Sequence, residues 1–129
     1  MIGAERVDFV SIPVTDRERA VAFYGDTLGL ERDPKSRSDW PEFALGNVTV
    51  SLVFPDRIGR PMENTPFGAI AIRVLDVEQA RATLESAGVE FEGDTFDSGV
   101  CQMAFFRDPD GNGLMLHHRY APYADGSTP

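Results

Sequence analysis

An internal repeat constrains the fold of this chain more than any other feature. The segment IPVTDRERA, starting at Ile12, aligns with IRVLDVEQA, starting at Ile72, at a constant spacing of 60 positions. Isoleucine, valine, aspartate, glutamate and alanine all recur at that spacing. A repeat this long is a module with its own secondary structure and not a solenoid unit. The 129 residues therefore predict one domain made of two similar modules.

Each copy of the repeat predicts a strand that leads into a helix. Aliphatic side chains alternate over residues 10–14 and again over residues 70–74, as in a half-buried strand. Thr15 with Glu18 forms a capping-box pattern, and Asp76 with Gln79 repeats it. The two helices are predicted to end near residues 28 and 87, before glycines that suit a left-handed cap.

Strand periodicity returns after each helix. Strands are predicted near residues 30–33, 41–46 and 47–54, and again near 89–92, 99–107 and 113–119. The segment DPDGN at residues 108–112 predicts a tight turn between the last two strands. The chain thus divides into module 1 at about 5–54, a linker at 55–66, module 2 at about 67–120 and a loose tail at 121–129.

The alternation gives the predicted sheet two different sides. The even-numbered side chains of the opening and closing strands are all aliphatic, so this side is expected to pack under the helices. The odd-numbered side is mixed and rich in small residues: Phe9, Ser11, Thr49, Ser51, Ala69, Ala71, Met115 and His117. That side is expected either to line a cavity or to pack on a partner subunit.

Composition excludes several classes of function. A net charge of −9 argues against nucleic acid and against anionic membranes, because both need a basic surface. No apolar run is long enough to span a membrane, and the start MIGAERVDF does not resemble a secretory signal. A single cysteine fits a reducing compartment, so a cytoplasmic location is expected.

The segments VDFVSIPVTDRERAVAFYGDTLGL, IAIRVLDVEQARATLESAGVEF and FFRDPDGNGLML together resemble the vicinal oxygen chelate superfamily. This superfamily includes glyoxalase I, fosfomycin resistance proteins, extradiol dioxygenases and bleomycin resistance proteins. The resemblance covers about residues 6–120 and implies an α+β fold. In it, two tandem βαβββ modules form a curved mixed sheet around a cavity, with the helices on the outer face. The resemblance also implies a homodimer.

The resemblance places the metal ligands of the family at positions that cannot bind a metal in this chain. Phe9 and Ala69 stand where the opening strands usually carry histidine, and Met115 stands where the last strand usually carries glutamate. Ser51 is the matching position in the first module. A divalent site needs three or four nitrogen, oxygen or thiolate donors, so we expect no metal and no other cofactor.

Cys101 and His117 are the two obvious candidates for a nucleophile and a base. A Cys–His pair could in principle form a reactive thiolate, but a lone cysteine is more often a small buried apolar residue. His118 has the opposite parity and no expected chemical role. We therefore name Cys101 and His117 only as weak catalytic candidates.

Apolar and aromatic side chains dominate the predicted ligand-binding residues. This set comprises Phe9, Ser11, Trp40, Ser51, Ala69, Cys101, Met103, Phe105, Met115 and His117, with Phe67 nearby in the sequence. Trp40, beside Asp39 and Glu42, either covers the end of the barrel or binds a flat or cationic ligand.

Three functions remain open from the sequence. The leading hypothesis is a metal-independent protein that sequesters an apolar or aromatic small molecule or antibiotic, similar to the bleomycin resistance type. The alternative is a metal-free isomerase, cyclase or lyase that uses His117 or an acid as general base. A third hypothesis is a scaffold whose odd-numbered side only supports dimerisation.

Overall fold

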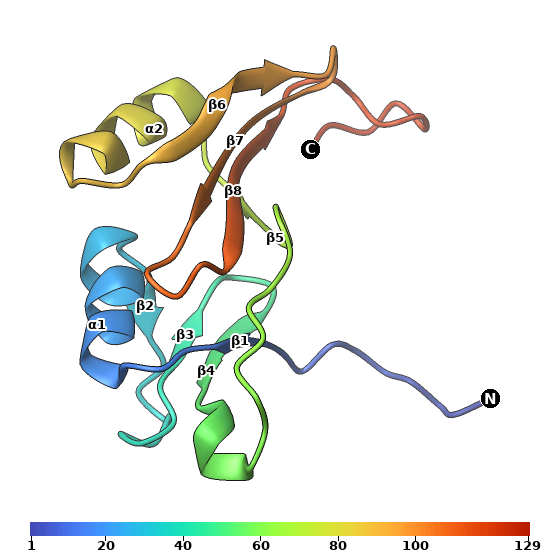
Figure 1. Ribbon diagram of the computed structural model, residues 1–129. Helices are drawn as coiled ribbons and strands as arrows, with labels where there is room; N and C mark the ends of the chain where they lie inside the picture. Colours follow the sequence, from blue (N-terminus) through green and yellow to red (C-terminus); the bar gives the residue numbers. More distant parts are fainter. The chain divides into compact units, whose positions relative to one another are not determined.

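The computed structural model describes residues 1–129 and divides into two compact units, Met1–Asn64 and Thr65–Pro129. Each unit contains a four-stranded mixed sheet and one main helical segment, which confirms the predicted α+β class (Figure 1). The strand orders are β1-β4-β3-β2 and β5-β8-β7-β6, so the same topology occurs twice. The sheets are separate and neither closes on itself. No helix is long and apolar enough to cross a bilayer.

The first unit follows the strand, helix and three-strand order expected from the repeat. Its elements are β1 (Phe9–Pro13), α1 (Arg17–Val21), η1 (Ala22–Thr27), β2 (Glu31–Arg32), β3 (Glu42–Ala44), β4 (Thr49–Val53) and η2 (Pro55–Ile58). Strand β1 is parallel to β4, whereas β3 is antiparallel to both β4 and β2. The predicted linker thus begins with a short 3₁₀ helix, η2.

The second unit repeats this arrangement with longer strands. Its elements are β5 (Ile70–Arg73), α2 (Val77–Ser86), β6 (Phe91–Asp97), β7 (Cys101–Arg107) and β8 (Gly113–Arg119). Strand β5 is parallel to β8, and β7 is antiparallel to both β8 and β6. Helix α2 packs on β6, β7 and β8 (Figure 1).

Aspartates begin both helices, which corrects one prediction. The Asp16 carboxylate accepts from the backbone N–H of Arg19 at 2.9 Å, and Asp76 accepts from that of Gln79 at 3.0 Å. The predicted cap Thr15 is therefore wrong by one residue. With Asp16 as the N-cap, the third helical residue is Arg19, whose N–H the carboxylate reaches. A capping box needs glutamate or glutamine at that third position, whereas Glu18 is the second helical residue.

The two helices end where the sequence predicts, but by different geometries. The last turns of the first helix are a π-helix, in which the N–H of Leu28 donates to the carbonyl of Phe23 at 2.9 Å. The second helix remains α-helical to Ser86. Gly29 and Gly88 follow with φ of 72° and 92°, which is the left-handed conformation expected of a C-terminal cap.

Most even-numbered aliphatic side chains lie in the core of each unit, as predicted, but Ile70 and Ile72 of β5 are only half-buried. In the first unit Ile12 and Leu52 are fully buried, and Tyr24 of η1 packs on Phe43 of β3. Apolar residues of the second unit with at most 3% exposure are Val77, Ala104, Phe106, Leu114 and Leu116. Burial of these aliphatic and aromatic groups supplies the main stabilisation of each sheet–helix pair.

Strand β6 differs most from the prediction. It runs from Phe91 to Asp97, whereas the sequence pattern predicts an end near residue 92. The pairing with β7 shifts between Glu92 and Phe96, where a bulge accommodates extra residues of β6. The two extra residues shift the pairing by a whole alternation period, and Gly93, Asp94 and Asp97 are poor strand formers, so the sequence pattern does not reveal the second half of this strand.

Candidate functional site

The strand registers show which positions of the two units correspond. Ser11 lies opposite Ser51 in the first unit, and Ala71 lies opposite Met115 in the second. Residues 11 and 71 are one repeat apart, so Ser51 and Met115 are structurally equivalent. We call the side of each sheet that carries these residues the odd face.

The odd face of the first unit is small and mostly polar. Phe9 lies opposite Thr49 at the start of β1 and its side chain is 53% exposed. Ser11 is exposed, and Ser51 is buried at 8% exposure. This face therefore offers one aromatic ring beside hydroxyl groups.

The odd face of the second unit carries an aromatic and methionine surface. Phe105 lies opposite Met115 between β7 and β8, and the Phe67 ring stacks on Phe105 with centroids 4.4 Å apart. Met103 lies opposite Phe96 of β6. We call these five residues the aromatic patch. Phe67 and Phe96 are 52% and 54% exposed, so flat apolar area remains available on this unit.

Close backbone contacts hold Phe67 against the sheet. A Cβ on Gly113 would lie 2.0 Å from the carbonyl oxygen of Pro66, so only glycine allows the chain to pass here. The Gly113 N–H donates to the Thr65 hydroxyl at 3.1 Å, and the Thr65 N–H donates to Asn112 Oδ1 at 2.9 Å. The segment leading into β5 is thus fixed across the start of β8.

The predicted turn at residues 108–112 is confirmed. Asp108 Oδ1 accepts from the backbone N–H groups of Asp110 and Asn112, and Asp108 Oδ2 accepts from the Asn112 side-chain amide at 2.8 Å. Asn112 is fully buried. The Asp108 carboxylate therefore builds the turn, as the sequence suggests, and Asn112 of this turn accepts from the Thr65 N–H.

The weak catalytic candidates do not face each other. Cys101 lies opposite Arg119 on β8, whereas His117 lies opposite Met103 and beside Arg73 of β5. His118 has the opposite parity, as predicted, and its Nδ1 lies 2.9 Å from the carbonyl oxygen of Val74. The thiol and the imidazole are thus diagonal neighbours on the sheet without a hydrogen bond between them.

Trp40 has different neighbours from those suggested by the sequence. Its indole packs on Phe54 with ring centroids 5.7 Å apart. Asp39 is held by Arg37 through two hydrogen bonds of 3.0 Å, and Arg57 donates to the Asp39 carbonyl at 2.9 Å. The guanidinium groups of Arg37 and Arg57 therefore lie beside the acidic residue that precedes Trp40.

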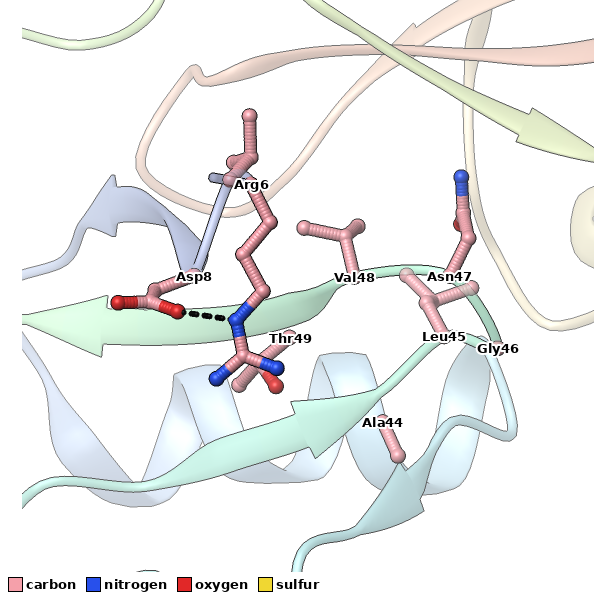
Figure 2. A pocket seen from close by; sticks show the side chains of 9 residues that line it. Arg6, Asp8, Ala44, Leu45, Gly46, Asn47, Val48 and Thr49 are labelled. Atoms are coloured by element: carbon pink, nitrogen blue, oxygen red, sulfur yellow. Dashed lines mark hydrogen bonds and ion pairs between the residues drawn. The ribbon is translucent and has the colours of Figure 1, made fainter. Parts of the chain in front are cut away.

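A separate hollow of about 530 Å³ lies in the first unit between residues 6–8 and the β3–β4 hairpin (Figure 2). The hairpin contributes residues 44–49, and an ion pair of 2.7 Å joins Arg6 and Asp8 at its border. None of the predicted ligand-binding residues lines it. The hollow adjoins the odd face only at Thr49.

The residues present do not fit the metal that the resemblance implies. The four positions hold a benzyl group, a hydroxyl, a methyl group and a thioether, which supply no set of hard or borderline donors. No group of three or more His, Cys, Asp or Glu side chains is arranged to hold a metal ion elsewhere in residues 1–129. No reaction step is therefore derived through a metal.

Comparison with known proteins identifies the family. The chain belongs to the Glyoxalase/Bleomycin resistance protein/Dioxygenase superfamily, whose family model matches residues 6–116. The uncharacterized protein YaeR of Escherichia coli strain K12 is 33% identical over 130 residues, which cover 92% of this chain and all of YaeR.

Two solved structures from Streptomyces sp. CB03234 are also similar. TnmS3, described as an antibiotic binding protein, is 26% identical with a TM-score of 0.75, covering 92% of this chain and 99% of TnmS3. A glyoxalase/bleomycin resistance protein from the same organism is 29% identical with a TM-score of 0.68, covering 88% of this chain and all of that protein. The predicted family is thus confirmed.

Proposed function

We propose that this protein binds an apolar or aromatic small molecule without a metal and sequesters it, as an antibiotic-binding protein would. The observation that carries the proposal is the type of side chain on the odd faces of the two sheets. Positions that hold ligands in metal-dependent relatives carry Phe9, Ser51, Ala69 and Met115 here. Such side chains contribute contact area and offer little to stabilise developing charge.

The aromatic patch supports this function. The Phe67–Phe105 stack has an interplanar angle of 23°, and a planar ligand ring adds to such a stack at little conformational cost. Methionines at positions 103 and 115 are deformable and fill the gaps around an irregular ligand. The similarity to TnmS3 is consistent with a ligand of this kind. We infer that the ligand contacts the aromatic patch and the predicted ligand-binding residues beside it in the second unit: Ala69, Cys101, Met103, Phe105, Met115 and His117.

A thermal-shift screen with aromatic natural products, polyketides and glycopeptide antibiotics tests the proposal. At least one compound is expected to raise the unfolding midpoint, because a ligand at about 100 times its Kd stabilises by about 2.7 kcal/mol. Absence of stabilisation by every class would contradict sequestration. Incubation with the same compound, followed by chromatography, is expected to return it unchanged.

Variants then locate the binding surface. Phe67→Ala and Met115→Ala are each expected to weaken binding about tenfold, the factor corresponding to about 1.4 kcal/mol of stacking and contact energy. Leu75→Ala is the control, because Leu75 is 87% exposed in the loop before α2 and lies outside the aromatic patch. Equal affinity in all three variants would place the ligand elsewhere.

The family resemblance also leads us to propose a cytoplasmic homodimer as the binding form. Light scattering coupled to size-exclusion chromatography measures the mass directly, and twice the chain mass of 14.2 kDa is expected. A monomer that binds the ligand fully would contradict a dimeric site.

A further inference from the structure

Three arginines converge on one tight turn of the first unit. The turn is closed by a hydrogen bond of 3.2 Å from the Trp40 N–H to the carbonyl of Arg37. Arg17 donates to the Ser38 carbonyl at 2.6 Å, and Arg57 donates to the neighbouring Asp39 carbonyl at 2.9 Å. Adjacent residues lie about 3.8 Å apart, so these two guanidiniums are held at neighbouring points of the turn.

The positive charge of this group is only partly neutralised. Arg37 pairs with the Asp39 carboxylate, whereas Arg17 and Arg57 donate to backbone carbonyls. Of the three guanidiniums, only that of Arg37 forms an ion pair, although the net charge of the chain is −9. Partial burial opposes ionisation of Asp39, but the hydrogen bond and charge of Arg37 and the charge of Arg57 outweigh it and lower the pKa of Asp39.

The arginines are also held in place before any ligand arrives. The Arg57 guanidinium lies 4.2 Å from the centroid of the Phe54 ring, whose other neighbour is the Trp40 indole. Phe54 is 2% exposed, so the stack is anchored in the core of the unit. Preorganised guanidiniums bind oxyanions through paired charge-assisted hydrogen bonds and lose little side-chain entropy on binding.

We propose that the turn formed by residues 37–40, with Arg17 and Arg57, binds the oxyanion group of a small molecule, a phosphate or a carboxylate. Most N–H groups of these guanidiniums remain unused by the bonds above, so they are available to such a group. Trp40 lies beside the bound group and offers a ring to any aromatic portion of the same molecule. This site belongs to the first unit alone and does not depend on the sequestration of an apolar ligand.

Trp40 is the single tryptophan of the chain, so its fluorescence reports on this site directly. Sodium phosphate and sodium acetate are titrated into the full-length protein, with sodium chloride at matched ionic strength as reference. A saturable change in Trp40 emission with phosphate or acetate, absent with chloride, is expected. Phosphate alone would indicate a tetrahedral group, and a response to acetate would indicate a carboxylate. The same response to chloride as to both oxyanions would overturn the proposal.

Variants distinguish an oxyanion site from a structural brace. Arg17→Gln and Arg57→Gln are each expected to weaken oxyanion binding about tenfold, as loss of one charge-assisted hydrogen bond predicts. Arg60→Gln is the control, since Arg60 is an exposed neighbour that is held by its backbone N–H on the Pro55 carbonyl. Equal affinity in all three variants would overturn the proposal.

A variant that is expected to bind the oxyanion more tightly tests the site even if the arginine variants fail to fold. Asp39→Asn removes the carboxylate that competes with the ligand, while its backbone carbonyl still accepts from Arg57. This variant is expected to bind phosphate or acetate several-fold more tightly than the unmodified protein. Unchanged or weaker binding in a folded Asp39→Asn protein would contradict an oxyanion site.

Discussion

Gly113→Ala is expected to damage the second unit more than its small size suggests. A Cβ at this position would lie 2.0 Å from the carbonyl oxygen of Pro66 and 2.8 Å from the backbone nitrogen of Gly68. Both atoms belong to the backbone, so no side-chain rotation relieves the contact. The segment that carries Phe67 must instead move away from β8.

Two weakened hydrogen bonds and one steric overlap determine how much unfolding free energy Gly113→Ala loses. Movement of this segment weakens the bond from the Gly113 N–H to the Thr65 hydroxyl and the bond from the Thr65 N–H to Asn112. Two hydrogen bonds contribute about 1 kcal/mol each, and overpacking costs about 1–3 kcal/mol. We therefore expect a loss of about 3–5 kcal/mol of unfolding free energy, which lowers the thermal midpoint by at least about 10 °C.

Thermal unfolding followed by far-ultraviolet circular dichroism measures this effect. Gly25→Ala is the matched control, because a Cβ there would meet only the Phe43 ring, at 3.4 Å, and the residue lies in the helix η1. That variant is expected to be neutral or to gain about 0.5–1 kcal/mol. A midpoint for Gly113→Ala within about 2 °C of the unmodified protein would refute the reasoning about the Pro66 contact.

Helix caps and titrating groups give three further predictions. Asp16→Ala and Asp76→Ala are each expected to cost about 1 kcal/mol in urea unfolding, and a loss below about 0.3 kcal/mol would contradict the observed caps. Hydrogen bonds from the Gly99 N–H and the Tyr120 hydroxyl lower the pKa of Asp97. The ionised Asp97 carboxylate therefore stabilises the fold fully above the usual pKa of 3.8, and this stabilisation is lost as the pH falls through the lowered pKa of the folded state. Asp97→Asn should therefore reduce the acid sensitivity of urea midpoints, and unchanged sensitivity would argue against this linkage. The hydrogen bond to Asp97 raises the pKa of Tyr120, so the stability that this pair contributes declines as the pH rises above 10.0. In an absorbance titration, Asp97→Asn should form the Tyr120 phenolate at a lower pH than the unmodified protein does.

The sequence predicts the fold well because the fold depends on regular patterns. The 60-residue spacing identifies two modules, and strict alternation separates the buried side of each sheet from the odd face. Local signals also define the helix ends and the turn at residues 108–112. The strand register confirms the predicted equivalence of Ser51 and Met115, although loops of different length precede these two strands.

The site is less predictable because it depends on contacts between distant residues. Trp40 is surrounded by guanidinium groups, but Arg17 and Arg57 lie far from it in sequence and only the fold brings them to the same turn. Phe96 lies opposite Met103 because a bulge in β6 shifts its pairing with β7 by two residues. Neither relation leaves a periodic signal in the sequence.

Calorimetric titration of the strongest ligand from the thermal-shift screen tests metal-independent binding most directly. The titration is performed before and after exhaustive chelation, and again with Met115→Glu, which places a carboxylate on the odd face. We expect the same Kd before and after chelation, and much weaker binding in Met115→Glu because an apolar ligand would bury an unpaired charge. Binding that disappears on chelation and returns with added Zn²⁺ or Fe²⁺ would contradict metal-independent sequestration.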